Sequence, residues 1–409
     1  MPPDLLSRRG YLGLTLGTAS PSTGASSLPI TAVAPGSSAA GMGVLPGDRL
    51  THIDQNPVRD LGEVRTLLRG LRAGDPLLLE VTRGSETLRF EGSVLEFPLE
   101  RHAGARTELG VVRVKQHLLR ALAVIPAAPG PHPCVYYLPG AHWASEEYPL
   151  ELEQPVPALA GSLARAGIAF LRVERSGVGD SQGPSCTELG FEDELAGFRA
   201  GLEYLSGCDW ADPGRVGLLG HSVGAMVAPL LAEQAAIAGI VTFGASAVPI
   251  SAALIGALER HAELDLRERV TSLARARQIG ELIRLVVAGA TPEAVFLSRP
   301  DLRDAAPAHF RGDKAYHRSV RFLQELERYD LLGAWRRRAP RTLLLHGERD
   351  IVSSLADSET LAGVIGAPAS VRELPGVDHQ MSDAATTGRP RLAASVRESV
   401  LEFFGTTLG

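Results

Sequence analysis

Strands that alternate with helices from about Phe97 onward constrain this chain more than any other feature of its sequence. Short runs rich in Val, Ile and Leu recur there, and stretches of helical period separate them. Such alternation is typical of a mainly parallel sheet covered by helices on both faces. Strands are expected at Leu109–Val114, Leu119–Pro126, Cys134–Leu138, Ile168–Val173, Val216–Leu219, Ile237–Phe243, Thr342–Leu345 and Ser370–Leu374. Helices are expected at about Pro155–Ala166, Glu188–Leu205, Gly224–Ala235, Ser354–Gly366 and Arg391–Phe404.

Two pentapeptides in this region fit the pattern Gly-x-Ser-x-Gly, and their surroundings differ. Ser222 ends a predicted buried strand and precedes a helix of small residues, which is the strand–turn–helix setting of a nucleophile elbow. Gly220 and Gly224 would keep Cβ atoms out of a turn so tight that the serine adopts strained angles. Ser181 lies in a Gly-rich loop that Pro184 follows. We therefore expect Ser222 to be a nucleophile and Ser181 to shape a loop.

This part of the chain resembles the α/β-hydrolase family. Besides the Ser222 turn, the loop after the fourth predicted strand reads R-S-G-V-G-D-S, similar to the R-x-G-x-G-x-S of that family. The resemblance spans most of Leu109–Leu408. It implies an α/β-hydrolase fold and a serine hydrolase that cleaves an ester, or less favourably a thioester or an amide, through an acyl-enzyme. It implies no metal and no organic cofactor, because a triad and backbone donors supply the chemistry.

The family's chain order of nucleophile, acid and base places the two partners of Ser222. Asp350 follows one predicted strand in "TLLLHGERDIVSS", and His379 follows the next in "VRELPGVDHQM". The carboxyl ends of parallel strands meet at one edge of a sheet, where ligand sites collect. We expect His379 to be the general base and Asp350 the carboxylate that orients it.

Four other residues compete for these two roles. His221 is expected to point into the fold beside the elbow, and His346 to pack within a strand end. Glu348 and Asp378 lie near Asp350 and His379 in the sequence. Only Asp350, however, fills the Gly-x-x-Asp loop position of the family, and we therefore prefer it as the acid.

An oxyanion intermediate needs two preorganised donors. The backbone N–H of Val223 is expected to be one. The loop after "CVYYL" reads Pro-Gly-Ala where much of the family has His-Gly-x, so the resemblance gives Ala141 N–H as the second. His142 and Trp143 follow in this loop and are candidate substrate contacts.

From Pro249 to Trp335 the strand signals stop and helical periodicity takes over. This insertion, at about 249–335, holds the position of the family's cap, which would cover the pocket and exclude water. Trp335 is a further candidate for the pocket lining.

The first hundred residues have a different pattern. Strands are expected at Tyr11–Leu16, Ile30–Ala34, Leu77–Arg83 and Thr87–Phe90, with an amphipathic helix near Leu61–Leu71. The series V-x-P-G-S-x-A…G-V-x-x-G-D resembles a PDZ domain of the bacterial protease type, a small α+β fold. In that family an x-Φ-G-Φ loop binds the C-terminal carboxylate of a peptide. The matching residues are Tyr11, Leu12, Gly13 and Leu14. We expect a PDZ-like domain at 1–96 and a hydrolase domain at 97–409.

Composition excludes several classes of partner. A net charge of −6 gives no reason to expect nucleic acid or an anionic membrane. No apolar run approaches the roughly 18 residues of a membrane span. The three cysteines are scattered without metal-site spacing and are expected to be reduced thiols. These observations favour a cytoplasmic protein, and the resemblance to the α/β-hydrolase family implies a small-molecule ester or acyl substrate.

Two alternatives stay open. A peptidase could use the PDZ-like domain to present peptide C-termini to the hydrolase. The chain could also be a peptide-binding adaptor with a catalytically silent hydrolase body, although Ser222, Asp350 and His379 together speak against it.

Overall fold

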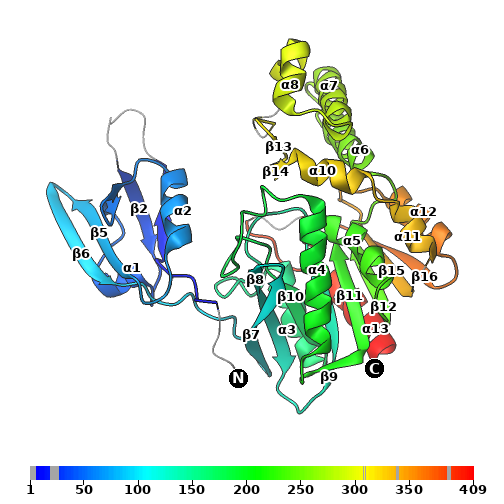
Figure 1. Ribbon diagram of the computed structural model, residues 1–409, viewed down its shortest axis with the longest axis horizontal. Coiled ribbons are helices and arrows are strands. Elements are labelled where there is room, and N and C mark those ends of the chain that lie inside the picture. The colour runs from blue at the N-terminus through cyan, green and yellow to red at the C-terminus, as the bar shows by residue number, and fades with distance from the viewer. Residues whose placement is uncertain (1–5, 19–26, 307, 309, 338–339, 385–387) are drawn as a thin grey trace. The chain divides into compact units, whose positions relative to one another are not determined.

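The computed structural model describes residues 6–18, 27–306, 308, 310–337, 340–384 and 388–409, which divide into two compact units (Figure 1). These units are Met1–Leu99 and Glu100–Gly409. Each has hydrophobic cores of its own, and each is described separately below.

Six short strands of the first unit form an antiparallel sheet in the order β1-β2-β3-β5-β6, and β4 pairs with β3. The strands are β1 Leu14–Leu16, β2 Leu28–Val33, β3 Arg49–Ile53, β4 Asn56–Pro57, β5 Pro76–Arg83 and β6 Glu86–Ser93. The helices are α1 Ser38–Met42 and α2 Leu61–Gly70. Alternate residues of β5 are buried, as expected for a strand with one face toward a core.

Two features of this unit differ from the expectation. The first strand begins at Leu14 rather than Tyr11, because Gly13 has a φ of +74° that interrupts extended backbone. The helix α1 was not expected, since only five residues of a Gly- and Ser-rich segment form it. Ser37 caps its start by accepting from Ala40 N, and Gly43 ends it at a φ of 92°.

The second unit is built on an eight-stranded sheet in the order β16-β15-β12-β11-β9-β10-β8-β7. Its strands are β7 Ala105–Val114, β8 His117–Pro126, β9 His132–Leu138, β10 Ala169–Val173, β11 Ala211–His221, β12 Gly239–Phe243, β15 Arg341–Gly347 and β16 Ala369–Leu374. Pairs from β10 through β16 are parallel, whereas β8 is antiparallel to both β7 and β10. The carboxyl ends of six neighbouring strands therefore share one edge.

Helices cover both faces of this sheet (Figure 1). They are α3 Pro155–Arg165, α4 Phe191–Ser206, α5 Val223–Ala232, α12 Leu355–Ile365 and α13 Ala394–Leu408. Residues of α3 and α13 pack in one core with alternate residues of β9 to β15, and residues of α4, α5 and α12 pack in the core on the other face. Two-sided burial explains why the central strands read as continuous apolar runs.

A mostly helical segment lies between β12 and β15. It consists of α6 Ile250–Glu263, α7 Arg269–Val287, α8 Pro292–Ser298, α9 Pro300–Ala305, the two-stranded hairpin β13 Lys314–Ala315 and β14 Arg318–Ser319, α10 Val320–Glu327 and α11 Leu331–Arg337. In Figure 1, α6, α7 and α8 lie together beyond one end of the sheet. The helix α10 packs against both α6 and α7.

Candidate active site

Ser222 lies at the junction of β11 and α5 in a strained backbone conformation. Its φ of 54° and ψ of −117° are rarely adopted by a residue with a side chain. A Cβ on Gly224 would lie 1.8 Å from the Leu138 carbonyl oxygen, and one on Gly220 would lie 2.6 Å from the Gly224 oxygen. Both glycines are thus required for the tight turn between strand and helix.

His379 and Asp350 form a hydrogen-bonded pair from the loops after β16 and β15. The distance from His379 Nδ1 to Asp350 Oδ2 is 2.8 Å. Asp350 also accepts from Ser353 Oγ at 2.6 Å and from two backbone N–H groups. Burial tends to raise the pKa of this carboxyl, but the contacts with His379 and Ser353 outweigh it and lower the pKa to about 2. The carboxylate is therefore charged at neutral pH and keeps the His379 ring in one orientation.

Ser222 and His379 line the same cavity, which has a volume of about 360 Å³. Among the described residues, the Ser222 hydroxyl has no hydrogen-bond partner, so the bond from Ser222 to His379 is not formed. Such bonds are often long before substrate binds and tighten in the reacting complex. The structure thus joins Asp350 to His379 and brings Ser222 to the cavity that His379 lines.

The two competing histidines, His221 and His346, are buried and have hydrogen-bond partners of their own. His221 is buried, and its Nε2 lies 2.8 Å from the His379 carbonyl oxygen, to which it must donate because a carbonyl only accepts. Burial lowers the pKa of His221 to about 3, so the ring is neutral. His346 is also buried, with Nδ1 3.5 Å from Ser353 Oγ.

The competing carboxylates and the second serine are engaged elsewhere. Glu348 accepts from the Gly376 N–H at 2.8 Å, and Asp378 accepts from two N–H groups of its own loop. Ser181 Oγ accepts from the Arg120 N–H at 2.9 Å. None of these three groups lines the cavity of Ser222.

The two expected oxyanion donors are residues of the cavity wall. Val223 is the first residue of α5, and the first N–H groups of a helix have no partner within it. Ala141 lies in the loop after β9, directly after Gly140. A Cβ on Gly140 would lie 3.3 Å from Ser222 Cβ, so this loop passes close to the serine.

Of the three expected substrate contacts, the structure brings two to the cavity. His142 and Trp143 line it, and the Trp143 ring lies 4.6 Å from the His317 ring. Trp335 does not line it. Only 1% of Trp335 is exposed, because α11 packs it into the core beside α5 and α12. The expectation for Trp335 was therefore wrong.

Much of the remaining wall comes from the helical segment and was not identified from the sequence. Its residues are Ile250, Ala253, Leu254, Ala257, Tyr316, Arg318, Phe322 and Leu323. The hairpin turn between β13 and β14 places two residues with side chains at positive φ, namely Tyr316 at 52° and His317 at 61°. Turns of this kind normally contain Asn or Gly, so no residue pattern at Tyr316 and His317 predicted this turn.

The first three x-Φ-G-Φ residues of the first unit form a loop that leads into β1 at Leu14, and among the described strands β1 lies at the edge of the sheet beside β2. The Tyr11, Leu12 and Gly13 carbonyls accept from the N–H groups of Ser38, Ala39 and Ala34. In a trans peptide the next N–H points away from the carbonyl. The N–H groups of Leu12, Gly13 and Leu14 are therefore directed away from these partners.

Two classes of feature are absent from the described part of the chain. No group of three or more His, Cys, Asp or Glu side chains there could hold a metal ion. No described helix combines the length and the hydropathy needed to cross a bilayer.

Comparison with known proteins gave two family matches. The profile of the alpha/beta hydrolase family matches residues 128–390, and that of the PDZ domain matches residues 10–94. These matches confirm both predicted resemblances and the predicted fold class. A search of curated proteins found no match.

Several solved structures are similar to this chain. Est1E from Butyrivibrio proteoclasticus is 16% identical, with a TM-score of 0.47 over 73% of this chain and 98% of its own. An esterase from Pyrococcus furiosus is 15% identical, with a TM-score of 0.48 over 76% of this chain and 97% of its own. The esterase domain of a Rhodothermus marinus protein is 18% identical, with a TM-score of 0.48 over 74% of this chain and 100% of its own.

Proposed function

Because this chain belongs to the α/β-hydrolase family and has a PDZ domain at its N-terminal side, we propose that it is a serine hydrolase that cleaves a carboxylic ester through an acyl-enzyme on Ser222. One observation carries the proposal. A serine in a strained elbow lines the same cavity as a histidine whose other ring nitrogen bonds a buried carboxylate.

In the proposed reaction, His379 Nε2 takes the hydroxyl proton while Ser222 Oγ attacks the ester carbonyl carbon. The N–H groups of Val223 and Ala141 stabilise the oxyanion that develops. His379 then gives its proton to the leaving alcohol oxygen as the C–O bond breaks. Water, deprotonated by the same ring, attacks the acyl-enzyme and releases the acid and the serine. Asp350 stabilises the imidazolium throughout.

The cavity favours an apolar acyl or alcohol group. Its wall includes Val223, Met226, Leu254, Phe322 and Leu323, and the enclosed volume of about 360 Å³ suits a group of modest size. We propose that residues 249–335 act as the cap that selects this group. Thioesters and amides would react by the same steps, the amide more slowly because an amine leaves less readily than an alcohol.

A specific observation also favours peptide binding by the first unit. The free edge of β1 and the directed N–H groups of Leu12, Gly13 and Leu14 offer what a peptide C-terminus needs. A peptide bound there would extend the sheet at β1. Binding of peptides together with cleavage of peptide bonds would make the protein a peptidase, and binding without any hydrolysis would make it an adaptor.

The test is burst kinetics with p-nitrophenyl butyrate on the full chain. We expect a burst of p-nitrophenol that is stoichiometric with the enzyme, followed by slower turnover, and loss of both in Ser222→Ala. Ser181→Ala is the matched control because it also removes a serine from a Gly-x-Ser-x-Gly pentapeptide. Equal turnover in Ser222→Ala and wild type would refute the assignment. If a fluorophosphonate does not label the wild-type chain, this result would favour the adaptor.

A further inference from the structure

A buried arginine outside the catalytic cavity contacts the loop that bears the second oxyanion donor. Arg175 follows β10, and Gly140 follows its parallel neighbour β9, so both lie at the same edge of the sheet. Arg175 Nη2 donates to the carbonyl oxygens of Gly140 and, at 3.3 Å, Pro139. The side chain thus reaches the peptide that joins Gly140 to Ala141.

The planar geometry of that peptide links the Arg175 contact at the Gly140 carbonyl to the direction of the Ala141 N–H. The Gly140 carbonyl and the Ala141 N–H belong to one planar unit and point in opposite directions. An interaction that fixes the carbonyl oxygen therefore also fixes the direction of the N–H. The Ala141 side of this unit faces the cavity of Ser222, whereas the described residues that line that cavity do not include Arg175.

Arg175 itself is buried between two carboxylates. Its Nε lies 3.0 Å from Glu194 Oε1, and its Nη1 lies 3.6 Å from Glu146 Oε1. Arg318 holds Glu194 from the other side, and only 4% of Arg175 is exposed. Burial tends to lower the pKa of the guanidinium, but attraction to Glu194 and Glu146 outweighs it and raises the pKa. The guanidinium is therefore charged at neutral pH.

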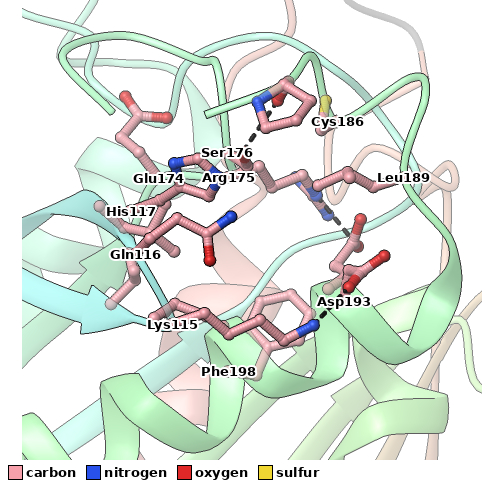
Figure 2. Close-up of a pocket in the computed structure, with 16 residues that line it drawn as sticks. Lys115, Gln116, His117, Glu174, Arg175, Ser176, Cys186, Leu189, Asp193 and Phe198 are labelled. Atoms are coloured by element: carbon pink, nitrogen blue, oxygen red, sulfur yellow. Dashed lines mark hydrogen bonds and ion pairs between the residues drawn. The ribbon is translucent and has the colours of Figure 1, made fainter. Parts of the chain in front are cut away.

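The opposite side of this arginine faces a separate space. Arg175, Glu174 and Glu194 are among the residues that line a second cavity of about 190 Å³ (Figure 2). Figure 2 shows Arg175 next to Glu174 in the wall of this cavity. Arg175 therefore reaches the cavity of Ser222 only indirectly, through the Gly140 loop and through Glu194, whose second partner Arg318 lines that cavity.

We propose that Arg175 is a positioning residue that directs the Ala141 N–H toward the developing oxyanion. This inference rests on the proposed function, since it assumes that an oxyanion forms at Ser222. It predicts a specific kinetic signature. Lysine at this position keeps the charge but cannot reproduce the planar set of donors, so the loop loses its alignment while substrate still enters the cavity.

The experiment compares Arg175→Lys with Arg172→Lys in the full chain. Arg172 is the matched control because it lies on β10, is fully buried and pairs with a glutamate, Glu100, but donates to the carbonyl of Glu146 rather than of Gly140. We measure kcat and KM for p-nitrophenyl butyrate and the affinity for an alkyl trifluoromethyl ketone, whose hemiketal adduct carries an oxyanion. Thermal unfolding shows whether each variant is folded.

For Arg175→Lys we expect kcat to fall by about 10- to 100-fold, part of the loss seen when one oxyanion donor is removed. KM should change by less than about 3-fold, and ketone affinity should fall in parallel with kcat. Arg172→Lys should leave kcat and ketone affinity within about 3-fold when it is folded. Unchanged ketone affinity in Arg175→Lys, or equal losses in both variants, would overturn the proposal.

A second variant keeps the test decisive if Arg175→Lys does not fold. Glu194→Gln keeps the volume of the side chain that holds Arg175 but removes its charge, and we expect the same parallel loss of kcat and ketone affinity at a smaller size. KM should stay within about 3-fold, because a disturbance of Arg318, which also pairs with Glu194 and lines the cavity, would change KM. No effect on either quantity would overturn the proposal. Failure of the proposed function itself is recognised separately, because wild type and Ser222→Ala would then not differ.

Discussion

Two loops of this protein are proposed to direct backbone N–H groups at a negative charge, and they are held in different ways. In the PDZ domain, the carbonyls of Tyr11, Leu12 and Gly13 accept from backbone N–H groups of neighbouring residues. In the hydrolase domain, the carbonyl before Ala141 accepts from the side chain of Arg175. The first loop is thus held mainly by backbone hydrogen bonds, with one side-chain bond from Ser38, while the second depends on one buried side chain and the carboxylates beside it.

The difference suits the proposed tasks. A peptide carboxylate is charged before it binds and remains so, and it can therefore select its donors during binding. An oxyanion exists only in the reacting complex, so its donors must be aligned in advance. A buried guanidinium, fixed by two carboxylates, provides that alignment at the hydrolase loop.

The largest expected effect on activity should come from the proposed proton relay, the triad of Ser222, His379 and Asp350, which lies outside both loops. The effects of the other substitutions are compared with it. Asp350→Asn should lower kcat for p-nitrophenyl butyrate by about 10⁴-fold, because the amide no longer stabilises the imidazolium and favours the wrong ring tautomer. Stopped-flow kinetics measures the effect. Asp378→Asn is the control, since Asp378 bonds only its own loop. A loss below 10-fold in Asp350→Asn would remove it from the relay.

The buried ion pair between Glu100 and Arg172 should make the stability of the hydrolase domain sensitive to acid. Burial tends to raise the pKa of Glu100, but Arg172 and His102 outweigh it and lower the pKa to about 2. The corresponding stability is complete above the ordinary pKa of 4.5 and is lost as the pH falls from about 4.5 to 2. Glu100→Gln should therefore lower the free energy of unfolding by about 3 kcal/mol at pH 7 and by much less at pH 2.5.

Tryptophan fluorescence follows this change in one domain, because Trp143, Trp210 and Trp335 all lie in the hydrolase domain. Asp48 of the PDZ domain is the matched control, since Arg83 lowers its pKa as well. Asp48→Asn should leave the fluorescence transition unchanged. A Glu100→Gln loss that is equal at both pH values would show that packing, not charge, holds this site.

In the PDZ loop, geometry rather than charge should be the vulnerable property. A Cβ on Gly13 would lie 2.1 Å from Ser37 Cβ, and φ at Gly13 is +74°. Gly13→Ala should destabilise the domain by about 2 kcal/mol and weaken binding of a peptide with a free C-terminus, measured by fluorescence anisotropy. Ester turnover should not change. Gly36→Ala is the control, because its φ of +70° carries the same strain but its Cβ would meet nothing within 4 Å.

The smallest effect should come from a side chain that merely supplements the PDZ loop. Ser38 Oγ donates to the Tyr11 carbonyl at 2.7 Å, and the Ser38 N–H donates to the same oxygen at 3.0 Å. Ser38 Oγ also accepts from the Leu95 N–H at 2.9 Å, so Ser38→Ala removes two side-chain bonds but keeps the backbone bond to Tyr11. It should cost about 1–2 kcal/mol in thermal unfolding, with peptide affinity within about 3-fold of wild type. A larger loss of affinity would mean that this loop, too, depends on side chains.

Local motifs made much of the fold and of the candidate site predictable. Two glycines between a predicted strand and a predicted helix indicated the elbow around Ser222. The positions of Asp350 and His379 were predicted because each follows the carboxyl end of a parallel strand. The helix α1 escaped prediction because its five residues carry no periodicity. Trp335 was misplaced because an aromatic residue in an apolar segment fits a core as well as a pocket.

The remaining wall of the cavity was beyond local reasoning. Helical periodicity identifies an apolar stripe, but not whether it faces a core or a cavity, so Leu254 and Phe322 gave no distinguishing signal. Arg175 was identified only as part of a motif. Its contact with Gly140 depends on two loops that are 35 positions apart in the chain and meet through strand pairing.

The turn at Tyr316 and His317 has a consequence for how such an enzyme can diversify. Two adjacent left-handed residues with bulky side chains are energetically unfavourable, so exchange of either for glycine would relax the backbone. Exchange of Tyr316, which lines the cavity, would also remove part of the cavity wall. Random substitution here would alter which acyl groups fit and would leave elbow and relay untouched. Substitutions at this one hairpin would therefore allow the substrate range to change during evolution while every intermediate sequence keeps the proposed catalytic residues.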